Sequence, residues 1–146
     1  SDIQAAVLLM QFKKINMLIS QRIALAKHYT FLLRDMETQG LLKTPSVPSN
    51  YRHNFQSYVI LLSRKIKRET LRSFLRSKGI ESQIGTYCIP RLQYYRKNLV
   101  IPKEAYQNAF FAYSHTLSLP LYHTLTIKEQ IFIVKTLKKS IKKCAE

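Results

Sequence analysis

The sequence predicts an α+β fold, in which a long N-terminal helix precedes a small sheet packed with helices. Apolar residues recur at three- and four-residue steps through the first forty positions, with no Pro or Gly before Gly40. Beyond residue 52, short runs rich in Val, Ile and Tyr alternate with amphipathic helical stretches in a βαβ-like order. A chain of 146 residues with 46% hydrophobic residues is long enough to bury the core of one domain.

The first element is predicted to be one long helix running from Asp2 into the thirties. Ser1 and Gln4 have the spacing of a capping box, which satisfies backbone N–H groups at the start of a helix. A helix of roughly 35 residues is about 50 Å long. Because this exceeds what a globule of this size needs, residues 1–40 are expected to bridge two bodies, one of them outside this chain. The absence of an initiating Met adds to the expectation of a fragment.

Residues 41–52 are predicted to form an extended linker. Gly40 is a plausible helix end, and Pro45 and Pro48 disfavour helix in the residues that precede them. The third region, residues 53–146, is then expected to form a compact domain.

Strands and helices alternate in this third region. The predicted strands are residues 56–62, 80–87 and 117–121, and the predicted helices are residues 69–78, 102–113 and a C-terminal helix that follows residue 126. Thr126 and Glu129 form a second capping box before the last helix. Its core stripe is predicted to comprise Ile127, Ile131, Val134, Leu137, Lys138 and Ile141.

The chain is strongly basic, with a formal net charge of +16. Seven of the cations cluster before and within the predicted helix 69–78: Arg64, Lys65, Lys67, Arg68, Arg72, Arg76 and Lys78. Such a run is usually the solvated face of an amphipathic helix, and this is the favoured interpretation. The alternative is a stand-alone basic module that binds nucleic acid or another polyanion, although the sequence carries no recognised motif for reading bases.

Several kinds of chemistry are disfavoured by the residues themselves. The three Gly residues are too dispersed for a phosphate-binding loop, and the four His residues have no ligand spacing for a metal. Cys88 and Cys144 suggest no disulfide framework, so a reduced, cytoplasmic setting is expected, with Cys88 an inert, partly buried thiol. No apolar run is long enough to span a membrane. No catalytic residue is assigned, and the chain is not expected to be a self-sufficient enzyme.

Four segments, in order, resemble the DegT/DnrJ/StrS sugar aminotransferases. Residues 1–12 are similar to the family pattern S-[DE]-I-Q-A-A-x-x-x-x-Q-L, and residues 53–59 to H-x-x-Q-S-Y-V. Residues 71–87 resemble L-x-x-x-G-I-E-T-x-I-G-T-Y, and residues 118–129 resemble S-L-P-L followed by L-T-x-x-E. The resemblance covers nearly the whole chain but only the C-terminal part of such an enzyme.

The resemblance implies the small domain of the aspartate-aminotransferase fold, with a mostly antiparallel sheet and a long interdomain helix. It implies a parent that uses pyridoxal phosphate to transfer an amino group from glutamate to a keto sugar nucleotide, in polysaccharide or amino-sugar biosynthesis. The cofactor lysine lies upstream in the family's large domain, so no cofactor-binding residue is expected in this chain. The parent is expected to be a homodimer; nucleic acid and membrane partners are not expected.

The positions that match family motifs give low-specificity candidates for substrate binding. They are His53, Gln56, Tyr58, Gly85, Thr86, Tyr87 and Arg91. For Tyr58 and His53 the alternative is that their side chains simply face the helix layer. Gly85 is expected to allow backbone conformations that other residues disfavour. The chain departs from the family at Pro90 and Arg91, where a His is common. One interpretation is that Arg91 provides a positive charge for a diphosphate instead. The alternative is that Arg91 is an ordinary surface residue.

Overall fold

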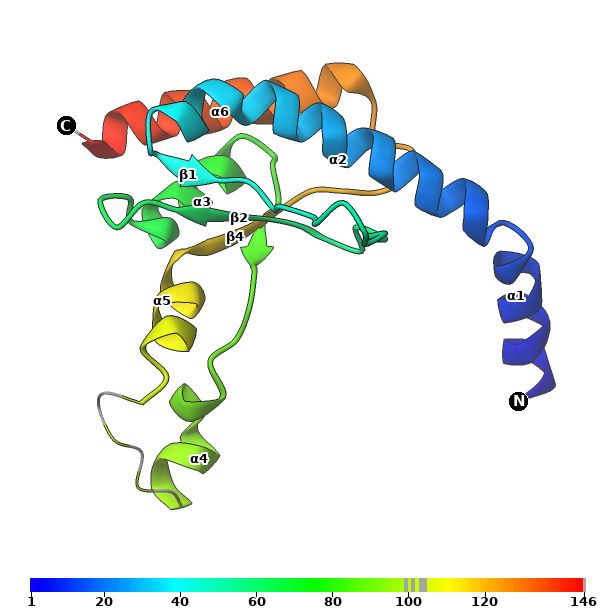
Figure 1. Ribbon diagram of the computed structural model, residues 1–146, viewed down its shortest axis with the longest axis horizontal. Helices are drawn as coiled ribbons and strands as arrows, with labels where there is room; N and C mark the ends of the chain where they lie inside the picture. The colour runs from blue at the N-terminus through cyan, green and yellow to red at the C-terminus, as the bar shows by residue number, and fades with distance from the viewer. Residues whose placement is uncertain (99, 101, 103–104, 146) are drawn as a thin grey trace.

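The computed structural model describes residues 1–98, 100, 102 and 105–145, and it confirms an α+β fold (Figure 1). The helices are α1 (Asp2–Phe12), α2 (Ile15–Thr38), α3 (Arg68–Ser77), α4 (Gln93–Asn98), α5 (Gln107–His115) and α6 (Ile127–Ala145), with a 3₁₀ turn η1 (Ile89–Arg91). The strands are β1 (Leu42–Lys43), β2 (Tyr58–Leu62), β3 (Gln83–Ile84) and β4 (Thr116–Leu119).

The four strands form one sheet in the order β1-β2-β4-β3, and each neighbouring pair is antiparallel. Because β2 and β3 are both antiparallel to β4, they run parallel to each other with β4 between them. The β2-α3-β3 segment is therefore a split βαβ unit. This arrangement confirms the mostly antiparallel sheet and accounts for the βαβ-like alternation in the sequence.

Helices α2, α3 and α6 cover one face of the sheet, and α2 and α6 run side by side along it (Figure 1). Successive strand residues point to opposite faces. Tyr58, Ile60 and Leu62 of β2 point into the helix layer and are fully buried or nearly so. Val59 and Leu61 point to the other face and are half-buried. The core therefore lies between the sheet and the three helices.

The prediction of one continuous N-terminal helix is wrong at Lys13 and Lys14, where α1 ends and α2 begins. The Ser1–Gln4 capping box is confirmed, with the Gln4 N–H donating to Ser1 Oγ at 3.4 Å. Neither Pro nor Gly marks the break, so the sequence holds no signal for it. Helix α1 turns away from α2 and buries none of its side chains (Figure 1).

Two helices end at glycines, as predicted. Gly40 and Gly79 have φ angles of +67° and +74°, a region that only glycine enters without strain. After each glycine the next N–H reaches five residues back, from Leu41 to the Met36 carbonyl and from Ile80 to the Leu75 carbonyl, both at 3.0 Å. These bonds turn the chain sharply towards the sheet.

The predicted linker 41–52 contains a strand that its prolines did not suggest. Leu42 of β1 is buried and pairs with Leu62 at the edge of the sheet. The predicted strand 80–87 is also shorter in the structure, because only Gln83 and Ile84 pair with β4.

The last two helices match their predictions in part. The Thr126–Glu129 capping box is confirmed, with the Thr126 N–H donating to Glu129 Oε2 at 2.7 Å. The predicted stripe of α6 is wrong at two positions: Ile127 is 50% exposed, and Lys138 pairs with Asp35 of α2 at 3.3 Å. Helix α5 begins at Gln107, five residues after the predicted start, and positions 103 and 104 of that prediction lie outside the described residues.

Candidate functional site

The residues predicted to bind substrate fall into two groups at opposite ends of the sheet. Tyr58 pairs with Leu119, so the residues that precede β2 lie beyond that end of β4. Ile84 pairs with Leu117, so the residues that follow β3 lie beyond the other end. The structure therefore brings His53, Gln56 and Tyr58 together in one group, and Gly85, Thr86, Tyr87 and Arg91 in another.

His53 lies in the exposed segment before β2, beside a pocket of about 570 Å³. Its Nδ1 accepts a hydrogen bond from the Phe55 N–H at 2.9 Å, and the two rings are 4.5 Å apart. Phe55 has a φ angle of +47°, which is uncommon for a residue with a side chain. The pocket is lined by Ile23, Lys27, Thr30, Pro45, Val47, Pro48, Ser49, Tyr51, Arg52, His53 and Phe55.

Arg22 of α2 holds this segment in place through its backbone. Its Nη1 donates to the carbonyls of Phe55 at 3.2 Å and Gln56 at 2.8 Å. The backbone carbonyl of Gln56 thus takes part in this contact, while the residue is exposed to solvent. No local pattern in the sequence marks Arg22 for this role, which depends on contacts with residues more than thirty positions away.

Tyr58 lies in the core, as the alternative interpretation of its position predicted. The side chain is 0% exposed, and its hydroxyl is 2.8 Å from Thr30 Oγ1 of α2. Burial raises the pKa of the Tyr58 hydroxyl to about 12, although the hydrogen bond with Thr30 opposes the shift. The hydroxyl is therefore a neutral group that joins β2 to α2.

Gly85 is required for close packing, and this differs from the backbone freedom expected of it. A Cβ atom there would lie 2.4 Å from Val59 Cγ1 and 2.7 Å from Thr116 Cβ. Such distances are well inside van der Waals contact. The next residue, Thr86, is exposed and its hydroxyl lies 3.5 Å from the Tyr87 carbonyl.

Tyr87 and Arg91 meet at the ring of Tyr113 in α5, and these residues form the Tyr113 cluster. The Tyr87 and Tyr113 ring centroids are 6.3 Å apart, and the Arg91 guanidinium carbon lies 5.4 Å from the Tyr113 centroid. Arg68 of α3 approaches the same ring at 5.4 Å. Tyr87 and Arg91 are exposed, so the cluster presents a cation and a phenol to solvent beside a buried second cation.

The prediction that the basic run is a solvated face is wrong at Arg68, whereas Arg64, Lys65, Lys67, Arg76 and Lys78 are exposed. Arg68 is 7% exposed, and its Nη1 donates to the backbone carbonyls of Tyr113 and Thr116. Its Nε and Nη2 donate to Glu69 Oε1 at 2.9 and 2.8 Å. The guanidinium is therefore paired and hydrogen-bonded, as a buried charge must be. It ties α3 to the start of β4.

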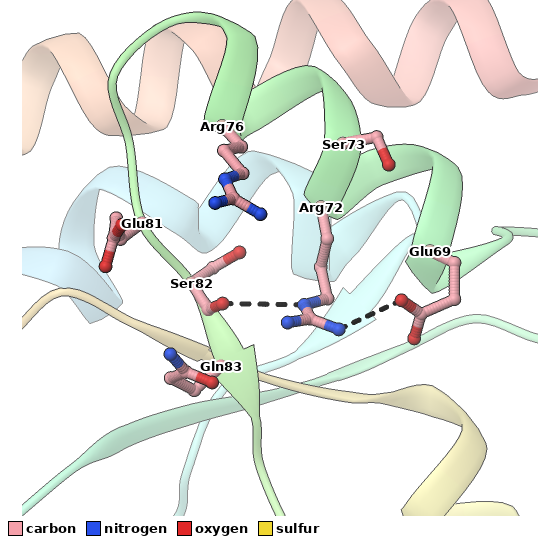
Figure 2. A pocket seen from close by; sticks show the side chains of 7 residues that line it. All are labelled: Glu69, Arg72, Ser73, Arg76, Glu81, Ser82 and Gln83. Carbon is pink, nitrogen blue, oxygen red and sulfur yellow. Dashed lines mark hydrogen bonds and ion pairs between the residues drawn. The ribbon is translucent and has the colours of Figure 1, made fainter.

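A further pocket of about 290 Å³ lies between α3 and β3 (Figure 2). Arg72 spans it, since its Nη1 donates to Glu69 Oε2 at 2.9 Å and its Nε to the Ser82 carbonyl at 3.4 Å. Burial raises the pKa of Glu69, but the hydrogen bonds and charges of Arg68 and Arg72 outweigh it and lower that pKa. The lining residues are Glu69, Arg72, Ser73, Arg76, Glu81, Ser82 and Gln83, none of which was predicted as a site residue.

The part of the chain that the structure describes has no cluster of metal ligands, and its Cys88 thiol is buried. No cluster of three or more His, Cys, Asp or Glu side chains occurs among those residues. Cys88 is a free thiol and is 1% exposed, more deeply buried than expected. Within the same residues, no helix is both long and apolar enough to cross a membrane.

Comparisons with known proteins give a consistent result. Residues 1–138 match the DegT/DnrJ/EryC1/StrS aminotransferase family. The chain is 28% identical to uncharacterized protein MJ1066 of Methanocaldococcus jannaschii over 144 residues, and 28% identical to the spore coat polysaccharide biosynthesis protein SpsC of Bacillus subtilis over 145 residues. Each alignment covers 97% of this chain and 36% of the relative.

A solved structure agrees with these relatives. A DegT DnrJ EryC1 StrS aminotransferase from Brucella abortus superposes with a TM-score of 0.78 at 26% identity, over 94% of this chain and 35% of that one. The chain thus spans little more than a third of the proteins it resembles. The family match extends over nearly its whole length, so the chain belongs to the DegT/DnrJ/EryC1/StrS aminotransferase family.

Proposed function

We propose that the chain is the C-terminal part of a pyridoxal-phosphate-dependent aminotransferase that acts on a keto sugar nucleotide. The single observation that carries this proposal is the family match over residues 1–138, in a chain that spans 36% of its curated relatives. One of these relatives is named for spore coat polysaccharide biosynthesis. In this proposal the chain contributes to the synthesis of a polysaccharide or an amino sugar, and it is not catalytic on its own.

The proposed division of labour assigns residues 1–40 to the interdomain helix, 41–52 to the linker and 53–146 to the small domain. Helix α1 supports this division, because it exposes a series of large apolar side chains. They are Ile3, Val7, Leu8, Leu9, Met10 and Phe12, each more than half exposed. Contiguous exposed apolar surface usually marks an interaction site. We assign it to contact with the large domain of the parent.

Pyridoxal phosphate belongs to the large domain in this proposal. The cofactor is held by a lysine amine activated by desolvation or by a neighbouring cation. Lys27 and Lys43 line pockets, but both are exposed. Among lysines whose side chains are described, only Lys138 is half-buried, and it pairs with Asp35 on the surface. The exposure of these lysines supports the placement of the cofactor lysine outside this chain, and no reaction step is assigned to the described residues.

We propose that the Tyr113 cluster is where this chain contacts the nucleotide diphosphate. The Arg91 guanidinium is exposed, and arginine matches phosphate oxygens with paired N–H donors. Tyr87 and Arg91 both contact the Tyr113 ring, and Thr86, which precedes Tyr87, is exposed. His53 lies at the other end of the sheet, so in this proposal it contacts a different part of the substrate.

The partners and location of the parent follow from the same proposal. Glutamate and the sugar nucleotide bind between this chain and the large domain, the parent is a homodimer, and it works in the cytoplasm.

The complete gene product that contains this chain provides the test. We expect it to bind pyridoxal phosphate, to lose the cofactor's visible absorbance on addition of glutamate, and to recover it on addition of a keto sugar nucleotide. Arg91→Gln is expected to raise KM for the sugar nucleotide about tenfold, with kcat and the glutamate half-reaction unchanged. Arg96→Gln, the same change on exposed α4, is the matched control.

Two outcomes would contradict the proposal. A gene product that binds no pyridoxal phosphate would refute the aminotransferase activity. Equal effects of Arg91→Gln and Arg96→Gln on KM would refute the assignment of the diphosphate to the Tyr113 cluster.

A further inference from the structure

The pocket between α3 and β3 contains a buried hydroxyl that has no partner. Among the described residues, Ser82 Oγ is a buried side-chain oxygen without a hydrogen bond. Buried polar groups are almost always paired, and an unpaired one calls for an explanation. In Figure 2 the Ser82 side chain points into the space between the guanidinium groups of Arg72 and Arg76.

The groups that flank this hydroxyl define the missing partner. Arg72 and Arg76 are donors only, because a guanidinium has no acceptor atom. A ligand that accepts the hydroxyl proton would therefore lie between two positive charges. An oxyanion meets both conditions.

The two arginines retain donors for such a ligand. Arg72 uses Nη1 and Nε within the chain, and no bond to its Nη2 is recorded among the described residues. Arg76 is exposed and has no recorded ion pair in the same part of the chain. Two guanidiniums and a hydroxyl approach from three directions, which matches the three free oxygens of a phosphate monoester better than the two of a carboxylate.

Two carboxylates, Glu69 and Glu81, line the pocket together with Arg72 and Arg76. The Glu69 carboxylate is engaged by Arg68 at 2.8 Å and by Arg72 at 2.9 Å. Glu81 is exposed, and Figure 2 draws it on the other side of the β3 segment from Arg72. A volume of about 290 Å³ is at the small end of the range for ligand pockets.

We propose that this pocket binds the phosphate group of a small phosphorylated ligand, held by Arg72, Arg76 and the Ser82 hydroxyl. The proposal does not rest on the proposed aminotransferase activity, since it uses only residues of α3 and Ser82, which directly precedes β3.

Calorimetric titration of the full chain at fixed ionic strength tests it. The probes are inorganic phosphate, glucose 1-phosphate and, as the carboxylate comparison, acetate. Because the chain has a net charge of +16, a charge-matched control is needed, and Arg34→Gln removes one exposed cation from α2. Arg76→Gln and Ser82→Ala each remove one of the three proposed contacts.

We expect one saturable phosphate site per chain and no saturable binding of acetate. Arg76→Gln is expected to weaken phosphate binding about tenfold and Ser82→Ala about fivefold, with Arg34→Gln unchanged. Tighter binding of glucose 1-phosphate than of phosphate would support a phosphate ester as the ligand, and equal binding would support free phosphate. Non-saturable binding, or equal losses in Arg34→Gln and Arg76→Gln, would overturn the proposal.

The Ser82→Ala variant has a second readout that needs no ligand. Removing an unpaired buried hydroxyl is expected to leave the denaturation midpoint of the free chain unchanged or raised. A lowered midpoint would mean that the hydroxyl has a partner within the chain, and would overturn the argument.

Discussion

The side-chain amide of Gln130 in α6 bonds to two groups of α2, the side chain of His28 and the backbone carbonyl of Leu25. Its Oε1 lies 2.7 Å from His28 Nδ1, and its Nε2 donates to the Leu25 carbonyl at 2.9 Å. Since a carbonyl can only accept, the amide nitrogen faces Leu25 and the amide oxygen faces His28. His28 therefore carries a proton on Nδ1. Gln130 is 0% exposed, so these bonds form inside the core.

Replacing Gln130 with Ala is expected to destabilise the chain by about 2–4 kcal/mol, because it leaves a cavity and removes the hydrogen-bond partner of His28 Nδ1. Urea denaturation measures the loss. Gln21→Ala, an exposed position of α2, is the control and is expected to stay within about 0.5 kcal/mol of the original chain. Equal effects of the two substitutions would show that the buried amide contributes nothing.

Arg68 and Arg76 lie on the same helix and give a second matched pair. Arg68→Met is expected to cost about 3 kcal/mol, since it removes a buried cation that donates to the carbonyls of Tyr113 and Thr116. Arg76→Met changes an exposed residue and is expected to cost less than about 0.5 kcal/mol. Thermal or urea denaturation compares the two. A chain that tolerates Arg68→Met as well as Arg76→Met would refute the role of Arg68 in joining α3 to β4.

Gly85→Ala is expected to destabilise the chain by about 2 kcal/mol or more, because the new methyl group would overlap Val59 and Thr116. Gly79→Ala is a useful comparison, since its Cβ would meet nothing within 4 Å although its φ is +74°. It is expected to cost about 1 kcal/mol from backbone strain alone. Adding Val59→Ala should recover part of the Gly85→Ala loss. No recovery in the double variant would place the cost elsewhere.

The buried tyrosines predict a loss of stability at high pH. Burial raises the pKa of Tyr58 from 10.0 to about 12, and burial also raises the pKa of Tyr29. Between pH 10 and 12 the unfolded chain loses protons that the folded chain keeps, so stability falls as pH rises, by up to about 1.4 kcal/mol per pH unit for each group. Urea denaturation at pH 9, 10 and 11 measures the slope. Tyr58→Phe should make it shallower, and an unchanged slope would contradict this assignment.

The sequence predicted the elements of the fold better than their extents. Capping boxes and glycine stops are local, so Ser1, Gly40, Gly79 and Thr126 marked helix ends correctly. The break between α1 and α2 has no such local mark. Strand β1 depends on pairing with residues about twenty positions away, which no local pattern reveals.

The candidate site was predicted only in part, for the same physical reason. Motif positions identified Tyr87 and Arg91, but their meeting point, Tyr113, lies on another element. Arg68 looked like one more solvated cation, because its burial depends on the carbonyls of Tyr113 and Thr116. The substrate role of the predicted residues stays a prediction.

Pyridoxal phosphate added to this chain alone is expected to label no single lysine stoichiometrically after borohydride reduction. The described lysines that line pockets, Lys27 and Lys43, are exposed and so lack the desolvation that activates an amine. Mass spectrometry of the reduced peptides locates any label. One fully labelled lysine would contradict the placement of the cofactor lysine outside this chain.

The coding sequence immediately upstream of Ser1 tests the central claim most directly. The chain spans 36% of its curated relatives, so we expect an open reading frame that continues upstream for nearly twice the length of this chain and encodes a cofactor lysine. A start codon directly before Ser1 would contradict the claim that this chain is the C-terminal part of an aminotransferase.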